Sequence, residues 1–381
     1  MMRAAIDILR GFPIQGILVA PKDQVVRTFD TRVQVLRAGH PVPDRDGLKA
    51  AHSVAAAVHN MRDHECLLCM ISGGASAMLP SPPAGVTLQD ESRLTKRLVN
   101  SAATIHEINT VRRHLSTLKG GRLVEQCRAS TILSLIVSDV PGNNLPDIGS
   151  GPTAEDPTTY QDSIEVLKRR DLWNDAPQQI RNHLMKGSRG QIPDTPKPGT
   201  SSFRRVHNLI IADNKTACMA ARKSLNENRI QAAVLTSSAE METSRMGKLL
   251  GSLGIRWKRH RETFRGSRAA ILGGETTVRV KAKGTGGRTQ ETVLWAVDDI
   301  ANLDGVVIAA LGTDGIDGNS RAAGALADGK TIERAKRKRL EPNDFLTRND
   351  SYRFFRELSD NLVTGPTGTN VGDIYLTVSI E

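Results

Sequence analysis

Two short apolar runs, each followed at once by a loop that contains glycine, place the strongest constraint on how this chain folds. The runs cover residues 66–71 and 131–140, and their apolar, β-branched character is typical of strands buried on both faces. Segments with helical spacing lie around them, at 46–61, 88–103 and 160–169. Strands that alternate with helices of this length indicate βαβ units, so the sequence predicts an α/β fold with a mostly parallel sheet.

A segment of linker-like composition separates two such patterns. Residues 187–203 contain three prolines and many glycine and serine residues, with almost no apolar side chains. We therefore expect two α/β domains, at 1–195 and 204–381. Inside the second domain, the basic stretch 256–268 is either a linker or a surface loop. The second pattern predicts strands at 206–212, 230–236, 269–272, 276–282, 305–311 and 373–380, and helices at 215–228, 240–253 and 288–300.

The composition excludes several classes of protein. With 381 residues, 39% hydrophobic and 24% charged, the chain is typical of a soluble protein of two or three domains. No apolar run approaches the roughly 20 residues that cross a bilayer. The first eleven residues lack the zones of a secretory signal, so we expect a cytoplasmic protein. Cys66 and Cys69 form a C-x-x-C, but on a strand they point to opposite faces and cannot share a metal or a disulfide.

The net charge of +11 is concentrated in two clusters, at 256–268 and 334–339. Basic stripes can bind nucleic acid, but aromatic residues make up only 3% of the chain and offer little base stacking. We favour solvated helix faces or a field that attracts an anionic small molecule. No nucleic-acid or membrane partner is expected, and self-assembly stays open.

Two loops near the end of the chain combine glycine and threonine with acid or amide side chains, at 312–318 and 364–370. Glycines let successive backbone N–H groups converge on an anion. Aspartates beside a phosphate require a divalent cation between them, and Asp314 and Asp317 are the candidates. The pattern indicates a phosphoryl-transfer site, with Thr369 and Asn370 as further binding residues; a pair of tight turns is the alternative.

In the first half, polar loops follow both apolar runs. Ligands of α/β proteins bind at the carboxyl ends of parallel strands, where these loops lie. Asp139 either faces that crevice or caps its own loop. A G-x-G-x-x-G dinucleotide fingerprint is absent, which disfavours NAD. The binding candidates in these loops are Ser72, Gly73, Gly74, Ser76, Ser150 and Gly151.

Arg288 stands at the predicted opening of a helix. An arginine there is unfavourable against the helix dipole unless an anion shares the site. A guanidinium binds phosphate or carboxylate groups with two parallel hydrogen bonds, so Arg288 is the candidate clamp, with a surface arginine as the alternative. Gly274, Glu275 and Gly287 lie in the neighbouring glycine-rich segments.

Together these segments resemble the glycerate kinases of the MOFRL type, some of which carry the name hydroxypyruvate reductase. The resemblance covers nearly the whole chain in order. It rests on AGHPVPD (38–44), RRHLS (112–116), KGGR (119–122), SDVPG (138–142), SGPT (150–153), GGRTQE (286–291), GTDGIDG (312–318) and TGPTGTN (364–370).

The resemblance implies an ATP-dependent kinase that acts on the alcohol group of D-glycerate with a divalent metal, more often giving 2-phosphoglycerate than the 3-isomer. It also implies an active site between an N-terminal Rossmann-like domain and a C-terminal domain whose MOFRL region spans about 269–381. The family's functional arginine falls on Arg288, and its glycine loop falls on residues 72–76.

Several positions depart from the family pattern. Ala75 replaces a usual glycine, Thr289 a usual asparagine, and Asn143 and Asn144 stand where acids are frequent. Family members also carry a strand and a Gly-Lys-Ala segment upstream of a helix that resembles residues 1–5 here. We expect that the start was assigned too far downstream; a degenerate homologue is the alternative.

The predicted mechanism is phosphoryl transfer by positioning and charge neutralisation. Glycine-rich loops hold the ATP phosphates, Mg²⁺ bridges them to Asp314 and Asp317, and Arg288 binds the substrate carboxylate or the transferring group. Asp139 is the candidate general base. Two alternatives stay open: a hydroxypyruvate reductase that uses NAD(P)H, and a truncated non-catalytic homologue that only binds ligand.

Overall fold

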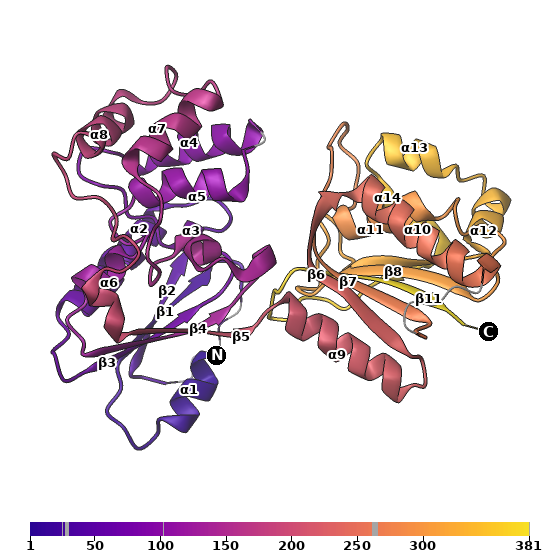
Figure 1. Ribbon diagram of the computed structural model, residues 1–381, viewed down its shortest axis with the longest axis horizontal. Helices are drawn as coiled ribbons and strands as arrows, with labels where there is room; N and C mark the ends of the chain where they lie inside the picture. Colours follow the sequence, from indigo (N-terminus) through magenta and orange to yellow (C-terminus); the bar gives the residue numbers. More distant parts are fainter. Residues whose placement is uncertain (25, 27–29, 102, 261–265, 381) are drawn as a thin grey trace. The chain divides into compact units, whose positions relative to one another are not determined.

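The computed structural model describes all residues except 25, 27–29, 102, 261–265 and 381 (Figure 1). Two compact units make up the chain. The first comprises residues 1–136 and 144–211, and the second comprises residues 137–143 and 212–381. Residues 261–265 of the predicted connection at 256–268 lie outside the described residues, and its first part continues helix α10, Thr243–His260.

The predicted boundary at 204 placed the strand at 206–212 in the second domain. The structure instead places this strand, β5 (Val206–Ala212), beside β4 in the sheet of the first unit. The preceding turn is fixed there by Arg205, whose guanidinium donates to Cys127 O at 2.6 Å and to Val124 O at 3.0 Å. The proline-rich segment before it is therefore packed against the first unit rather than being a free linker.

Five strands in two sheets form the first unit's framework. β3 (Cys66–Ile71), β4 (Thr131–Val137) and β5 form one sheet in that order, and β1 (Gly16–Pro21) pairs with β2 (Val33–Ala38) in another. The pairs β3/β4 and β1/β2 are both parallel, and Cys66 lies opposite Thr131. The α/β fold with a parallel N-terminal sheet is therefore confirmed.

Helices surround these strands and form two apolar clusters. One cluster joins α4, α5, α7 and α8 through Leu98, Val111, Leu167 and other buried side chains. The other packs α2 and α6 against β3 and β4. The helices are α1 (Met2–Ile8), α2 (Arg45–His59), α3 (Ala75–Met78), α4 (Leu88–Asn100), α5 (Ile105–His114), α6 (Arg122–Gln126), α7 (Tyr160–Arg169) and α8 (Gln178–Ser188), with short 3-10 turns η2 (Leu145–Ser150) and η3 (Ser201–Arg205).

The second unit is built on a six-stranded mixed sheet with the order β10-β9-β8-β11-β7-β6. Among the described strands of this unit, β6 and β7 pair in parallel and the four other neighbouring pairs are antiparallel. The strands are β6 (Ala232–Glu242), β7 (Ala269–Thr277), β8 (Val306–Gly312), β9 (Gly324–Asp328), β10 (Asn361–Leu362) and β11 (Asp373–Ser379).

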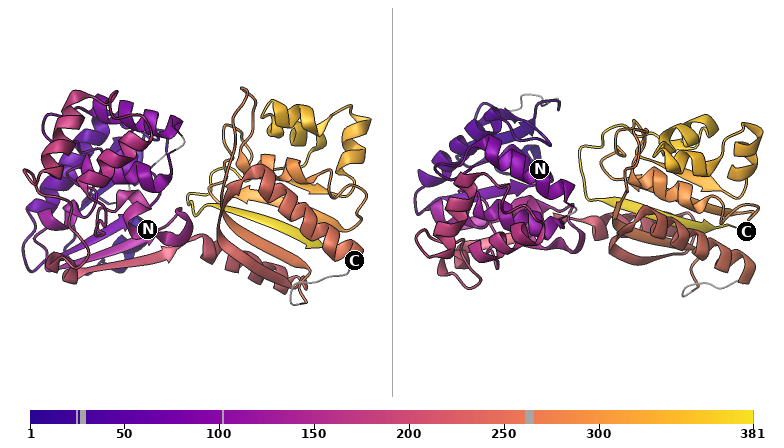
Figure 2. Two further views of the ribbon diagram at one scale, coloured as in Figure 1. Left: turned by 45° about the horizontal axis from the view of Figure 1, so that its top comes forward. Right: turned by 90° about the horizontal axis from the view of Figure 1, so that it is seen from above.

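Helices cover both faces of this sheet (Figures 1 and 2). Successive residues of β7 point to opposite faces, so Ile271 packs in the cluster with α9 while Leu272 packs in the cluster with α10, α11 and α14. The helices are α9 (Asn214–Glu227), α10, α11 (Arg288–Ala296), α12 (Thr331–Arg337), α13 (Pro342–Thr347) and α14 (Ser351–Leu358), and η1 (Pro141–Asn143) also belongs to this unit. Among the described residues, no helix combines the length and apolar character needed to span a membrane.

Candidate functional site

The polar residues of the second unit gather at one edge of its sheet. Asp373 is the first residue of β11, and the ladder places it opposite Gly274 on β7 and Gly312 on β8. Because β11 runs antiparallel to both neighbours, its beginning meets their carboxyl ends. Three segments that lie far apart in the sequence therefore contribute to a single site.

Arg288 is the first residue of α11 and reaches across this edge. Its Nε donates to Asp373 Oδ2 at 2.6 Å and its Nη2 to Asp373 Oδ1 at 3.2 Å, while Nη1 also pairs with Glu275. An arginine at a helix start is favourable only beside an anion, and here the carboxylates of Asp373 and Glu275 are that anionic partner. About a third of the Arg288 side chain (32%) stays exposed, which leaves part of the guanidinium open to a ligand.

Asp373 is buried and lies at the centre of this network. Burial raises its pKa to about 6, although the ion pair with Arg288 opposes that change. Tyr375 donates its hydroxyl to Asp373 Oδ2 at 2.8 Å, and burial raises the pKa of Tyr375 well above 10. Thr276 Oγ1 lies 2.9 Å from the same hydroxyl. Burial lowers the pKa of Arg288, but Asp373 and Glu275 outweigh it and raise this pKa above its usual value.

Asp317 holds the start of α11 in place. Its two oxygens accept hydrogen bonds from Thr289 N at 3.1 Å, from Gln290 N at 2.9 Å and from Gln290 Nε2 at 2.8 Å. Gly287, the N-cap residue, permits this approach, since a Cβ there would lie 2.3 Å from Asp317 Oδ1. A carboxylate at a helix N-terminus satisfies otherwise unpaired N–H groups. Both oxygens of Asp317 are therefore engaged in fixing the start of the helix.

The two glycine- and threonine-rich loops lie against each other. Thr313 Oγ1 donates to Gly372 O at 2.7 Å, and Thr367 Oγ1 donates to Thr313 O at 2.6 Å. Thr367 N donates to Asp314 O at 3.0 Å. Thr369 is exposed in the second loop, and Asn370 Oδ1 accepts from Gly372 N at 3.0 Å. The loops therefore form one continuous polar surface beside Asp373.

Asp314 differs from Asp317 in its bonding. It is half-buried, and within the described parts of the chain only its Oδ1 is engaged, by Ile316 N at 3.0 Å. Within the part of the chain that the structure describes, no group of three or more His, Cys, Asp or Glu side chains is placed to hold a metal ion. A Mg²⁺ ion that binds through phosphates and water needs only one or two protein carboxylates, and the open oxygen of Asp314 fits that requirement.

The structure adds residues that sequence reasoning missed. Asn214 Nδ2 donates to Val371 O at 2.9 Å and to Asp373 O at 2.8 Å, so it fixes the start of β11. Its neighbour Asp213 caps α9 and accepts from Asn143 Nδ2 at 2.7 Å. The one sequence feature that could have indicated these two residues is their position as an Asp-Asn pair directly after an apolar strand. Asp139 lies half-buried in the same short segment, 137–143, as Asn143.

In the first unit, the loop Ser72-Gly73-Gly74 follows β3 and opens the short helix α3. Ser72 is exposed, Gly73 is half-buried and Gly74 has a φ of +84°. Ala75, which replaces a usual glycine of the family, is not among the residues of positive φ. The substitution is therefore compatible with the backbone here.

A chain of hydrogen bonds supports this loop from behind. Ser76 Oγ lies 2.9 Å from Ser150 Oγ, which donates to Asn109 Oδ1 at 2.8 Å. Asn109 Nδ2 donates to Asp147 Oδ1 at 3.3 Å, and buried Arg113 donates to the same oxygen at 3.0 Å. Ser150 and the glycines that flank it, among them Gly151, all have positive φ. The candidate residues of the first unit are thus brought together by one network.

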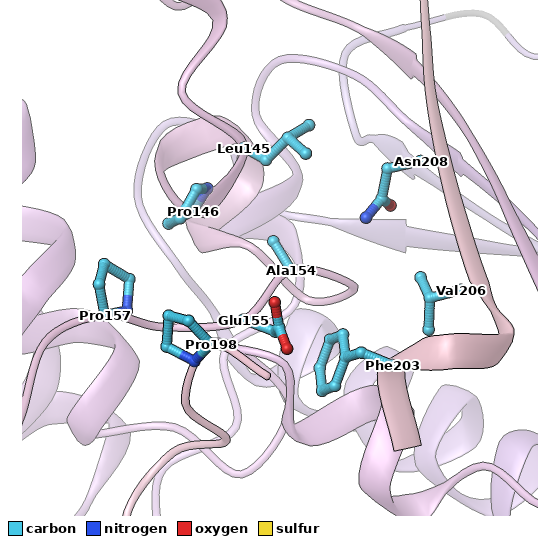
Figure 3. Close-up of a pocket in the computed structure, with 9 residues that line it drawn as sticks. All are labelled: Leu145, Pro146, Ala154, Glu155, Pro157, Pro198, Phe203, Val206 and Asn208. Atoms are coloured by element: carbon cyan, nitrogen blue, oxygen red, sulfur yellow. The ribbon is translucent and has the colours of Figure 1, made fainter. Parts of the chain in front are cut away.

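A pocket of about 330 Å³ opens beside the turn that follows Gly151 (Figure 3). Its wall is largely apolar, with Asn208 and Glu155 as polar members. Asn208 bonds both the side chain and the carbonyl of Thr153, at 2.9 Å each, so its amide is already satisfied. The lining residues are Leu145, Pro146, Ala154, Glu155, Pro157, Pro198, Phe203, Val206 and Asn208.

Two α/β units with glycine-rich loops at their strand ends define an α/β fold class in which ligands bind at the carboxyl ends of strands. Two family models match the chain: a domain of unknown function (DUF4147) over residues 1–185, and the MOFRL family over residues 268–373. The chain is 36% identical to a glycerate 2-kinase of Pyrococcus horikoshii, over 91% of this chain and 78% of that protein.

A D-glycerate 2-kinase of Thermotoga maritima is 33% identical over 99% of this chain and 87% of that protein. The crystal structure of a Thermotoga maritima glycerate kinase superposes with a TM-score of 0.88, at 33% identity, and covers 99% of this chain and 88% of that chain. The chain therefore belongs to the MOFRL-type glycerate kinase family, as the sequence motifs predicted.

Proposed function

We propose that this protein is a phosphotransferase that moves the terminal phosphoryl group of ATP to the 2-hydroxyl of D-glycerate. Relatives that are named glycerate kinases support D-glycerate as the alcohol acceptor, and the matches cover 78% to 88% of those chains. Those relatives named for a position are named 2-kinases, which supports 2-phosphoglycerate over the 3-isomer as the product. A cytoplasmic location stays a prediction.

The observation that carries the proposal is the geometry of Arg288. Asp373 and Glu275 hold its guanidinium at a fixed place, and part of it remains exposed. A charged donor that is fixed before the reaction needs no reorganisation when charge develops in the transition state. In this proposal Arg288 binds the glycerate carboxylate or the phosphoryl group in transfer.

Each unit carries glycine-rich loops that we propose for binding phosphate groups. In the first unit these are residues 72–76, with Ser150 and Gly151 behind them. In the second unit Gly274, Gly287, Thr369 and Asn370 lie at or near the sheet edge that carries Arg288. Loops of this kind bind phosphates through converging N–H groups.

A divalent cation is part of the proposal. Asp314 would hold Mg²⁺ through its open oxygen, and the ion would neutralise charge on the nucleotide phosphates. Asp317 would act indirectly, by fixing the start of α11. Asp139 is proposed as the group that accepts the proton of the substrate hydroxyl.

A coupled assay tests both the reaction and the position. Enolase accepts 2-phosphoglycerate directly, but it needs a mutase to use the 3-isomer. We expect D-glycerate, ATP and Mg²⁺ to give absorbance at 240 nm with enolase alone. Absorbance that requires added mutase would contradict the 2-position, and no ATP consumption at all would contradict the kinase.

The reductase alternative is tested in the same preparation. Oxidation of NAD(P)H at 340 nm with hydroxypyruvate, in the absence of ATP, would favour a reductase. Thermal stabilisation by ADP or D-glycerate without turnover would favour a protein that only binds its ligands. The kinase proposal expects turnover with ATP and no oxidation of NAD(P)H.

A further inference from the structure

A second group of charged residues lies in the first unit, and the mechanism above does not use it. Lys119 is 3% exposed and Glu91 is 5% exposed, so both charges are buried. Arg112 is half-buried near them at the end of α5. Burial of two cations and one anion leaves this cluster with one uncompensated positive charge.

The three side chains do not satisfy one another. Lys119 Nζ forms an ion pair with Glu91 Oε1 at 3.7 Å, and its hydrogen bond to Leu79 O is long at 3.4 Å. Glu91 Oε2 is buried and has no hydrogen-bond partner among the described residues. The structure records no acceptor for the Arg112 guanidinium within its described residues. Buried polar groups normally find partners, so a cluster with several open donors is unusual.

The electrostatics of the cluster agree with this geometry. Burial lowers the pKa of Lys119, Glu91 opposes that change, and Arg112 adds to it by repulsion. Burial likewise lowers the pKa of Arg112, although Glu91 opposes it. An added anion would reverse both effects, because it would supply the missing opposite charge.

The position of Lys119 connects the cluster to the candidate site. Its side chain bonds Leu79 O, at the end of the helix that the glycine loop opens. The residues after it are tied to the other loop of the site, since Gly120 N donates to Ser150 O at 3.0 Å and Gly121 N donates to Gly151 O at 2.7 Å. Lys119 therefore contacts the end of α3, the helix that follows the glycine loop, and the two residues after Lys119 contact residues 150–151.

We propose that Arg112 and Lys119, with Glu91 as their counter-charge, form an oxyanion-binding subsite beside the glycine loop of the first unit. Its ligand is a carboxylate or phosphate group of a small molecule. This inference rests on the proposed function in one respect: the two available sources of that group are D-glycerate and the nucleotide.

Binding of inorganic phosphate, at constant ionic strength, tests the subsite without relying on catalysis. We expect phosphate to raise the melting temperature of the wild-type protein and to have at least a tenfold lower affinity for Arg112→Ala. Arg112→Gln keeps a polar side chain without the charge and should behave in the same way. Arg93→Ala removes an exposed arginine from α4, near Glu91, and should bind phosphate as the wild type does.

Titration calorimetry with D-glycerate and with ADP identifies the source of the anion. A loss of at least tenfold for D-glycerate alone assigns the carboxylate to this subsite, and a loss for ADP alone assigns a phosphate. A loss for both supports the subsite without separating the sources. Lys119→Met removes the second cation and should also lower the affinity for phosphate at least tenfold. If Lys119→Met fails to fold, the double variant Lys119→Met/Glu91→Gln removes both members of the buried pair and is tested instead.

The inference and the proposed function can fail separately. If Arg112→Ala binds phosphate, D-glycerate and ADP within twofold of the wild type, the subsite is refuted while the kinase stands. If phosphate binding depends on Arg112 but no glycerate is phosphorylated, the subsite stands and the proposed function fails.

Discussion

The two charged centres of this protein, one in each unit, differ in how well their charges are paired. Around Arg288, two carboxylates and a tyrosine hydroxyl satisfy one another at hydrogen-bond distances. Around Arg112 and Lys119, the single carboxylate, Glu91, forms an ion pair with Lys119 at 3.7 Å, and its other oxygen has no hydrogen-bond partner among the described residues. The first arrangement is complete in the free chain, whereas the second lacks an anion.

The paired and the unpaired centre should therefore respond differently to a ligand. A paired network fixes a side chain before the ligand arrives, and removing one member leaves a buried charge alone. An unpaired cluster is unfavourable by itself and becomes stable when an oxyanion enters. Substitutions should therefore affect chemistry at Arg288 and ligand affinity at Arg112.

The largest expected effect is that of Arg288→Ala. Loss of a fixed charged donor should lower kcat/KM for glycerate at least a hundredfold, or about 2.7 kcal/mol. Arg288→Lys keeps the charge but loses the bidentate geometry, so its kcat/KM should lie between those of the wild type and Arg288→Ala. Arg279→Ala, which removes an exposed arginine of the same unit, is the matched control. A tenfold or smaller loss in Arg288→Ala would exclude Arg288 from the proposed role.

The pH dependence of stability should reveal Asp373. Its pKa in the folded protein, about 6, lies above the ordinary value near 3.9, so the folded state holds a proton between these values that the unfolded state has released. Raising the pH from 4 to 6 should therefore lower the free energy of unfolding, by on the order of 2–3 kcal/mol from this residue. Urea titrations measure the free energy of unfolding of the wild type minus that of Asp373→Asn, and this difference should fall as the pH rises. A difference that is flat or grows with pH would contradict the account.

Asp314 and Asp317 form a matched pair with opposite expectations. Asp317→Asn places an amide against three N–H donors and should destabilise the fold by about 2 kcal/mol, seen as a lower melting temperature. Asp314→Asn keeps its acceptor for Ile316 N and should leave the melting temperature nearly unchanged. The expected defect of Asp314→Asn is weaker binding of Mg²⁺, so that the rate reaches half of its maximum at a several-fold higher Mg²⁺ concentration. The reverse pattern would reassign the metal to Asp317.

The smallest expected effect is that of Ser150→Ala. The substitution leaves Ser76 and Asn109 without their shared partner, which should cost about 1 kcal/mol of stability and raise KM a few-fold. Ser188→Ala, at an exposed position on α8, is the control. An unchanged KM in Ser150→Ala would mean that this chain of hydrogen bonds does not position the glycine loop.

Local patterns predicted much of the fold. The strand at 66–71 matches β3 in both bounds, because a short apolar run between polar segments leaves little freedom. The strands expected at 269–272 and 276–282 are instead the single strand β7, which continues through Gly273 and Gly274. Gly274 keeps the ladder with a φ of +147°, a conformation that no other residue adopts without strain. The two glycines led to the prediction of a break between two strands, but in the structure Gly274 lets one continuous strand pass close to Ala239.

The site was less predictable than the fold because its partners meet only through tertiary structure. Arg288 and Asp314 could be proposed from their loops, but Asp373, the main partner of Arg288, is 85 positions away along the chain. Its place depends on the antiparallel pairing of β11 with β7, which the alternation of strands and helices does not specify. Asn214 was missed for the same reason.

The most direct test of the central claim is transfer of label from ATP carrying ³²P in its γ-phosphate to D-glycerate, measured in parallel for the wild type and Arg288→Ala. The account predicts labelled phosphoglycerate from the wild type, formed at least a hundredfold more slowly by the variant. No labelled phosphoglycerate from the wild type, or equal rates for the two proteins, would contradict it.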